Sequence, residues 1–180
     1  MNTTKDLFKQ AFTVGLMVAG ALILLDLLLY IFDFTGMGMA AGILISMLSL
    51  GIYIGFFIWG GRKYRKDFYN GYISYGKALF FCLVVSLVLT LSIALYDVIF
   101  YYLFDPERAA NEAQLKINML SEYNMPDEIK EQQIQKFLDK ATPGWAVINS
   151  IIGTLSTSVL LSLISALFIK KREKISDVNL

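Results

Sequence analysis

Two carboxylic acids lie inside long apolar stretches of this sequence, Asp26 in the first and Asp97 in the third. A charged side chain at mid-membrane costs about 2.5–3.5 kcal/mol on the insertion scale, so acids in such stretches need a structural or functional reason. Each acid is followed four residues later by a tyrosine, Tyr30 or Tyr101. We therefore take the two acids, Asp26 and Asp97, each with its tyrosine, Tyr30 or Tyr101, as the candidate intramembrane polar pair.

Three roles are open for the two acids. In a structural role, each carboxyl bonds to Tyr30, Tyr101 or a serine or threonine of a neighbouring helix. In a transport role, the acids support proton- or cation-coupled movement of a small solute. In a catalytic role, they activate water between them, as the acids of aspartic proteases do. Lipoprotein signal peptidases are small four-span proteins with two aspartates, but the Asn-x-x-Asp run before their second acid is missing here.

Other kinds of chemistry are poorly supported by the residue types. The chain has no histidine and one cysteine, Cys82, so a histidine base, a structural zinc site and an internal disulfide are not expected. We predict no cofactor and no metal. The net charge of +1 gives no indication of nucleic-acid binding, and Cys82 is expected to pack in an apolar environment. The prediction is therefore a protein that is not an enzyme.

The elements that position these residues are four apolar stretches. Hydrophobic residues make up 56% of the chain and charged residues 17%, against roughly 25% charged residues in a soluble domain. A hydrocarbon core about 30 Å thick needs about 20 apolar residues in a helix. Four stretches reach that length, at about 11–32, 37–59, 78–104 and 145–169. We predict an all-α fold: one membrane domain over residues 1–180, arranged as a four-helix bundle.

The basic residues predict how the spans are oriented, because loops rich in Lys and Arg stay in the cytoplasm. The segment after the second span carries the basic cluster Arg62, Lys63, Arg65 and Lys66, and the C-terminal tail carries Lys170, Lys171, Arg172 and Lys174. The turn at 33–36 has no basic residue. Both termini are therefore expected in the cytoplasm, with the basic cluster as a topology determinant. Binding of anionic lipid by the cluster is the alternative.

The segment 105–144 is expected to lie outside, and it contains five basic and eight acidic residues. Asp105-Pro106-Glu107 has the residues of a helix start, with the helix running to about Tyr123. A second start at 124–128 leads to a helix that ends before Pro143-Gly144. We predict an extracytoplasmic helical hairpin, which either rests on the membrane or docks a partner.

Small residues recur at helical spacing in all four spans. The first and third spans match at one constant offset: Ala11 with Cys82, Gly15 with Ser86, Ala19 with Thr90, Asp26 with Asp97 and Tyr30 with Tyr101. Each set shares one helix face, which suggests a tandem duplication of a two-span hairpin. Gly51-x-x-x-Gly55 in the second span and Ser158, Ser162 and Ala166 in the fourth favour close helix packing, within one chain or between copies.

Several short runs resemble an uncharacterised bacterial family, domain of unknown function 4199 (DUF4199). Residues 71–78, Gly-Tyr-Ile-Ser-Tyr-Gly-Lys-Ala, resemble its Gly-x-Ile-Ser-Phe-Gly-x-Ala run, with Tyr75 in place of Phe. Asp105-Pro106-Glu107 is similar to its Asp-Pro-Glu element, and the last span ends in a Lys-rich tail as the family's does. The resemblance covers about residues 5–172. It implies a bacterial inner-membrane protein and supplies no activity or ligand.

The leading functional prediction is a non-enzymatic structural or partner-binding component of the bacterial inner membrane, multi-pass, with cytoplasmic termini. We expect it to lie in the lipid bilayer and to associate with further copies of itself or with an unidentified membrane partner. We do not expect nucleic acid as a partner. A proton- or cation-coupled transporter that uses Asp26 and Asp97 is the alternative, and an intramembrane aspartyl hydrolase is a remote one.

Overall fold

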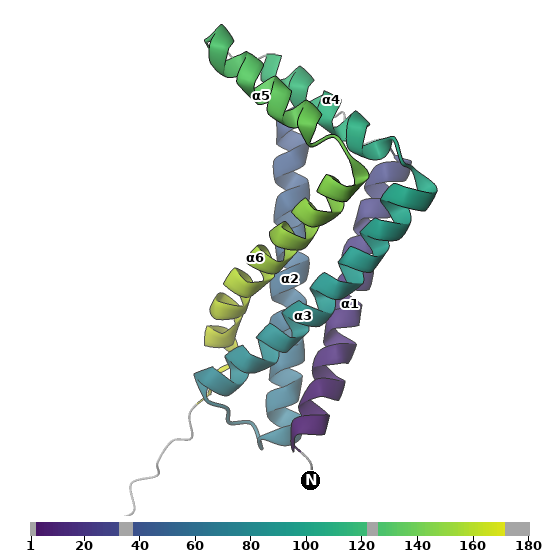
Figure 1. Ribbon diagram of the computed structural model, residues 1–180. Coiled ribbons are helices and arrows are strands. Elements are labelled where there is room, and N and C mark those ends of the chain that lie inside the picture. The colour runs from purple at the N-terminus through teal and green to yellow at the C-terminus, as the bar shows by residue number, and fades with distance from the viewer. Residues whose placement is uncertain (1–2, 33–37, 122–125, 172–180) are drawn as a thin grey trace, which may run out of the picture. The chain divides into compact units, whose positions relative to one another are not determined.

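The computed structural model describes residues 3–32, 38–121 and 126–171 (Figure 1). The described chain is helical throughout, apart from short connections and an isolated antiparallel bridge between Ile73 and Lys171. Its elements are α1 (Thr3–Ile31), α2 (Gly38–Phe68), α3 (Tyr75–Ile99), the π-helical turn η2 (Phe100–Phe104), α4 (Arg108–Ser121), α5 (Asp127–Asp139) and α6 (Pro143–Ile169). The predicted all-α class is confirmed.

Four helical stretches are long and apolar enough to cross a membrane. They are Lys5–Ile31, Ala41–Phe68, Tyr75–Phe104 and Pro143–Ile169, with 27, 28, 30 and 27 residues. At about 1.5 Å per residue, each exceeds the hydrocarbon core of about 30 Å. The predicted four spans are confirmed, and the chain is a multi-pass membrane protein. The predicted turn at 33–36 and the tail residues Arg172 and Lys174 lie outside the described residues.

The second span is longer than the sequence predicted. α2 continues past Trp59 to Phe68, so the basic cluster lies on a helix and not in the expected loop. Arg and Lys are good helix formers, and they do not end a helix by themselves. The helix ends just before Asn70 and Gly71, which have positive φ angles of 49° and 86°. This left-handed backbone reverses the chain toward α3.

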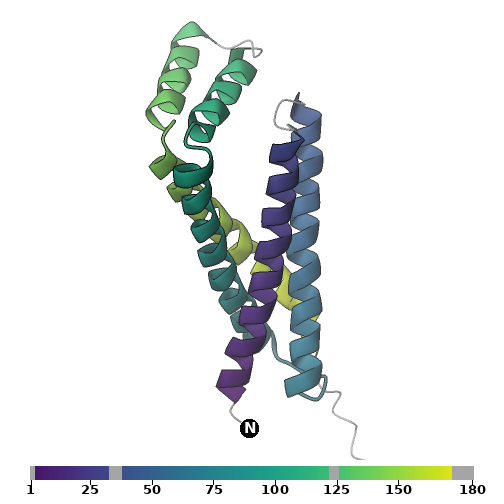
Figure 2. The same cartoon turned by 90° about the vertical axis from the view of Figure 1, so that its right-hand side faces the viewer.

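Contacts divide the chain into two units. The first contains α1, α2, the part of α3 up to Thr90 and the part of α6 from Leu155. Within it, α1 and α2 run side by side in opposite directions (Figure 2). Gly60 of α2 faces Val14 of α1 so closely that an added Cβ would lie 2.6 Å from Val14 Cγ2. A small residue therefore sets the spacing of these two helices.

Small and polar side chains also fill the buried faces of α1, α3 and α6 in the first unit. The six residues matched between the first and third spans in this unit are all buried: Ala11, Gly15, Ala19, Cys82, Ser86 and Thr90. The hydroxyls of Ser86 in α3 and Ser162 in α6 lie 2.9 Å apart. Each hydroxyl also lies within hydrogen-bond distance of a backbone carbonyl one turn earlier in its own helix, Cys82 at 3.0 Å and Ser158 at 2.8 Å. The contact between the two serines therefore joins two helices through buried polar groups.

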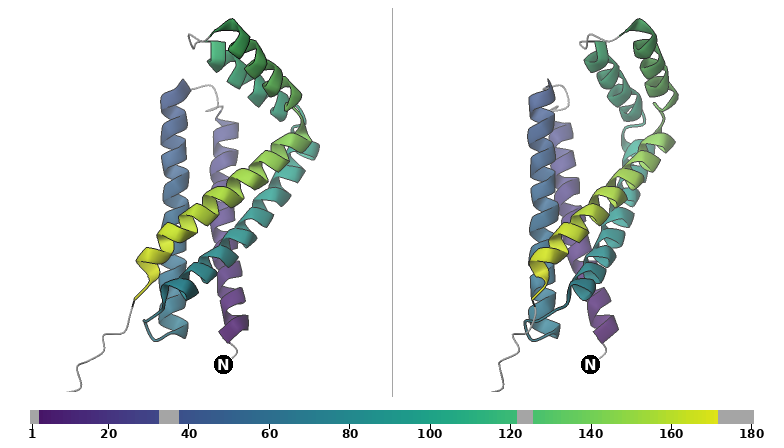
Figure 3. Two further views of the ribbon diagram at one scale, coloured as in Figure 1. Left: turned by 60° about the vertical axis from the view of Figure 1, so that its left-hand side comes forward. Right: turned by 90° about the vertical axis from the view of Figure 1, so that its left-hand side faces the viewer.

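The second unit contains α3 from Leu91, η2, α4, α5 and the part of α6 up to Thr154. α4 and α5 lie side by side as a helical hairpin (Figure 3). Tyr101, Ala109 and Val147 form a small buried core between η2, α4 and α6. The predicted helical hairpin between the third and fourth spans is confirmed, while its side of the membrane remains a prediction.

Two helix starts differ from the predicted ones. Asp105 is the C-cap of η2 and not the N-cap of α4, and its N–H donates to the Phe100 carbonyl at 2.9 Å and so closes the π-helical turn. α4 consequently begins at Arg108. α6 begins at Pro143, before the predicted Trp145, and the Thr142 hydroxyl accepts a 3.4 Å hydrogen bond from the Trp145 N–H. Threonine as N-cap followed by proline is a favourable helix start.

Candidate functional site

The turn η2 and the start of α4 bring together a tyrosine, an arginine and a glutamate. Tyr101 in η2 is buried, and its hydroxyl donates a 3.1 Å hydrogen bond to Glu112 Oε1. Arg108, one helical turn before Glu112, donates from Nε to the same oxygen at 2.9 Å. Two donors from different elements therefore fix the position of the Glu112 carboxylate.

Arg108 is held by aromatic rings as well as by Glu112. Its guanidinium carbon lies 4.6 Å from the centroid of the Phe100 ring and 5.5 Å from that of Tyr101. A guanidinium at this distance from a ring face is attracted by the negative face of the ring. The arginine thus links η2 to α4, and it contacts the ring of Tyr101, the other donor to the glutamate.

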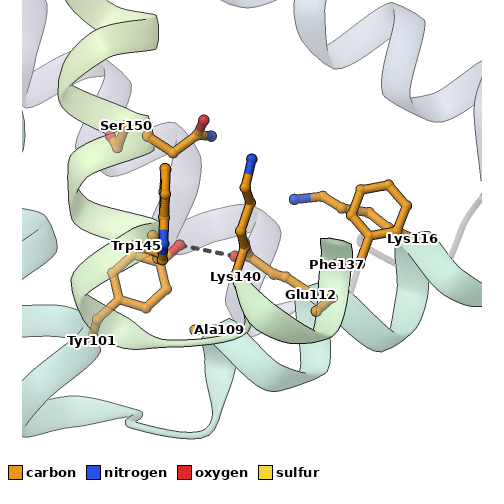
Figure 4. Close-up of a pocket in the computed structure, with 11 residues that line it drawn as sticks. Tyr101, Ala109, Glu112, Lys116, Phe137, Lys140, Trp145 and Ser150 are labelled. Atoms are coloured by element: carbon orange, nitrogen blue, oxygen red, sulfur yellow. Dashed lines mark hydrogen bonds between the residues drawn. The ribbon is translucent and has the colours of Figure 1, made fainter. Parts of the chain in front are cut away.

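A pocket of about 400 Å³ opens beside this cluster, and all its lining residues belong to the second unit (Figure 4). Its walls come from η2, α4, the end of α5 and the start of α6. The lining consists of the aromatic residues Tyr101, Phe137 and Trp145, the charged residues Glu112, Lys116 and Lys140, and the smaller residues Ala109, Ala113, Ala146, Asn149 and Ser150. Its volume falls within the roughly 300–1,000 Å³ of small-molecule sites.

The two lysines give the pocket its free positive charge. In Figure 4 the amino ends of Lys116 and Lys140 both point into the space between Trp145 and Phe137. The Lys140 ammonium lies 4.8 Å from the centroid of the Trp145 ring, a cation–π contact. Ammonium groups beside aromatic faces can hold a molecule that combines an anionic group with an apolar part.

Asp97 lies in α3, one helical turn before Tyr101, and both residues are buried. The Tyr101 hydroxyl gives its single proton to Glu112 and not to Asp97. The sequence predicts the intramembrane acids Asp26 and Asp97 as partners of Tyr101, and it does not predict the acid on α4. The structure therefore joins Tyr101 to the hairpin that follows the third span.

Asp26 and Tyr30 lie near the end of α1, in the first unit. Asp26 is half-buried and Tyr30 is 40% exposed. Asp97 and Tyr101 belong to the second unit. That the two acids face each other remains a prediction.

The basic cluster at the end of α2 is divided between two environments. Arg62, Lys63 and Lys66 line a surface hollow together with Trp59, and the Lys63 ammonium lies 5.6 Å from the centroid of the Trp59 ring. Arg65 instead points inward, where its Nη1 donates a 2.6 Å hydrogen bond to the carbonyl of Ile169. Their role as a topology determinant remains a prediction.

Sequence reasoning did not single out Glu112, Lys116 or Lys140. One signal was available, because Arg108, Glu112 and Lys116 are spaced by four residues and share one face of a helix. That spacing by itself indicates an ordinary exposed row of alternating charges. The pocket depends on Lys140 and Trp145, which only the packing of α4, α5 and α6 brings to the same place.

Comparison with known proteins places the chain in a family without an assigned activity. No curated protein and no solved structure matches the chain. A family described as protein of unknown function (DUF4199) matches residues 12–171, which is most of the chain. The protein therefore belongs to the DUF4199 family.

Proposed function

We propose that the protein is a non-enzymatic component of the bacterial inner membrane that binds a partner molecule in the pocket beside its helical hairpin. The observation that carries the proposal is the pocket itself, in which η2, α4, the end of α5 and the start of α6 enclose about 400 Å³ with aromatic and charged side chains. The hairpin that completes it is an insertion between two spans, so it adds a binding site to a membrane anchor.

The charge distribution supports an orientation with both termini in the cytoplasm and the pocket outside. Arg62, Lys63 and Lys66 are exposed at the end of α2, and Lys171 follows the end of α6. Basic residues at span ends stay on the cytoplasmic side. In this orientation Trp145 is at the level of the outer membrane interface, where tryptophan is enriched.

The geometry of the pocket favours binding over catalysis. Glu112 is the one acid in the lining, and two donors already hold its Oε1 at 3.1 and 2.9 Å. A carboxylate held in this way stabilises the wall of the pocket.

Filling the pocket tests the proposal on the full-length protein. Ala113 lines the pocket, whereas Ala110 is exposed on the same helix outside it. We expect native mass spectrometry to detect a bound component that co-purifies with the wild type and with Ala110→Trp, and that is lost from Ala113→Trp. Thermal unfolding checks that both variants fold. Identical spectra for the wild type and a folded Ala113→Trp variant would overturn the proposal.

A further inference from the structure

We propose that the pocket binds the phosphate headgroup of an anionic membrane lipid, between Lys116 and Lys140. This inference rests on the proposed function, since it names the chemistry of the molecule that the pocket takes. Lys116, Lys140 and Trp145 carry it, together with the apolar surface that continues along α6.

The pocket is positively charged, although the segment that forms most of it is acidic. Residues 105–144 contain eight acidic and five basic residues, but the lining contains two lysines and one acid. That acid, Glu112, already forms an ion pair with Arg108 at 2.9 Å. Two ammonium groups therefore remain to interact with a ligand, and they favour one that is anionic.

The lysines are available to a ligand. Among the described residues, Lys116 forms no hydrogen bond or ion pair, and Lys140 contacts the face of Trp145. Both amino ends point into one space in Figure 4. A phosphate accepts several hydrogen bonds at once, and binding to a charged donor makes each of them stronger. Asn149 and Ser150 add polar groups to the same wall.

A lipid fits better than a freely soluble phosphate ester, because the pocket adjoins apolar surface at the start of a membrane span. Trp145 lies in the first turn of α6, as interfacial tryptophans do at span ends. Ile148 and Ile152 follow on α6, one turn apart, and are 50% and 58% exposed. An acyl chain can lie along these residues while its headgroup occupies the pocket.

The test uses Trp145 fluorescence in the full-length protein in detergent. The chain has two tryptophans, so Trp59→Phe leaves Trp145 as the sole reporter. The probes are dihexanoyl phosphatidylglycerol, the zwitterionic dihexanoyl phosphatidylcholine and glycerol 3-phosphate. We expect a saturable change with phosphatidylglycerol at a concentration about ten-fold or more below that for phosphatidylcholine.

Lysine variants locate the site. Lys116→Gln leaves the contact between Lys140 and the Trp145 ring in place and is expected to weaken phosphatidylglycerol binding about ten-fold, the loss that follows from one charged hydrogen bond. The double variant with Lys140→Gln should weaken binding further. Lys136→Gln, on the exposed face of α5 outside the pocket, is the matched control and should bind as the wild type does.

Several results would overturn the inference. Equal binding of the two lipids, or unchanged binding in both lysine variants, would show that the pocket does not recognise an anionic lipid. Glycerol 3-phosphate binding as tightly as phosphatidylglycerol would replace the lipid by a soluble phosphate ester. If Ala113→Trp releases a bound component while Lys116→Gln and Lys140→Gln leave it in place, the proposed function stands and this inference fails.

Discussion

Arg65, near the end of α2, donates a 2.6 Å hydrogen bond from its Nη1 to the carbonyl of Ile169, the last residue of α6. The last carbonyls of a helix have no partner within that helix, so the arginine supplies one from a neighbour. Ile73, in the loop after α2, and Lys171, just after α6, exchange two backbone hydrogen bonds of 3.0 Å. Together these contacts fasten the end of α6 to α2 and to the loop before α3.

Replacing Arg65 by glutamine is expected to lower the free energy of unfolding by about 1.5–3 kcal/mol, the range for a hydrogen bond with a charged donor. Arg62→Gln removes the same charge from an exposed position of the same helix and should change stability by less than about 0.5 kcal/mol. Thermal unfolding of the purified protein in detergent measures both. Equal stability of the two variants would contradict a stabilising role for this hydrogen bond.

Gly61→Ala is expected to destabilise the protein by about 1–3 kcal/mol, because the added methyl group collides with the side chain of Ile169. Gly55 lies in the same helix with open space where its Cβ would be. Gly55→Ala should therefore be neutral, or stabilising by about 0.5–1 kcal/mol through helix propensity. Unfolding curves compare the pair. If Gly55→Ala instead destabilises the protein and also lowers its oligomeric size in detergent, a second copy of the chain covers this face.

The glycines illustrate what the sequence could and could not predict. Length and hydropathy predicted the four spans, since crossing a membrane constrains both. Spacing also placed Gly51 and Gly55 on one face, which made them candidates for close packing. Within α2 the close contacts are made by Gly60 and Gly61 instead. A spacing motif shows which residues share a face, and it does not show which face another helix covers.

The candidate site was harder to predict for a related reason. Intramembrane acids such as Asp97 stand out in a sequence because charge in lipid is costly. Lys116 and Lys140 do not stand out, because lysines on amphipathic surface helices are common. Their significance comes from Trp145 and from the turn η2, whose π-helical form ends α3 and places Tyr101 against α4. No local propensity in the sequence indicates such a turn.

Tyr101→Phe is expected to destabilise the protein by about 1 kcal/mol, because the ring stays while the hydrogen bond to Glu112 is lost. Tyr102, the next residue, is 54% exposed, so Tyr102→Phe is the matched control and should have a smaller effect. A double-mutant cycle with Glu112→Gln isolates the interaction. Strictly additive effects of Tyr101→Phe and Glu112→Gln would contradict coupling between these side chains.

Asp97→Asn is expected to lower stability by about 1–3 kcal/mol, and Asp26→Asn by less. Both acids have an interaction within the chain that an amide does not fully reproduce. Water cannot replace that interaction at Asp97, which is 7% exposed, as well as it can at Asp26, which is half-buried. Thermal unfolding of both variants and the double mutant provides the test, and non-additivity would show that the two acids interact. If all three variants match the wild type, the acids are not structural. That result would favour the transport alternative and make proton-flux measurements decisive.

Cysteine labelling is expected to place the hairpin outside and the basic end of α2 inside. The native Cys82 is fully buried, so it should not react with a membrane-impermeant maleimide in the folded protein. Gln132→Cys on α5 and Lys63→Cys on α2 introduce thiols at exposed positions. In intact bacterial cells, Gln132→Cys should be labelled and Lys63→Cys should be labelled only after the membrane is disrupted. The reverse pattern would invert the topology and move the pocket to the cytoplasmic face.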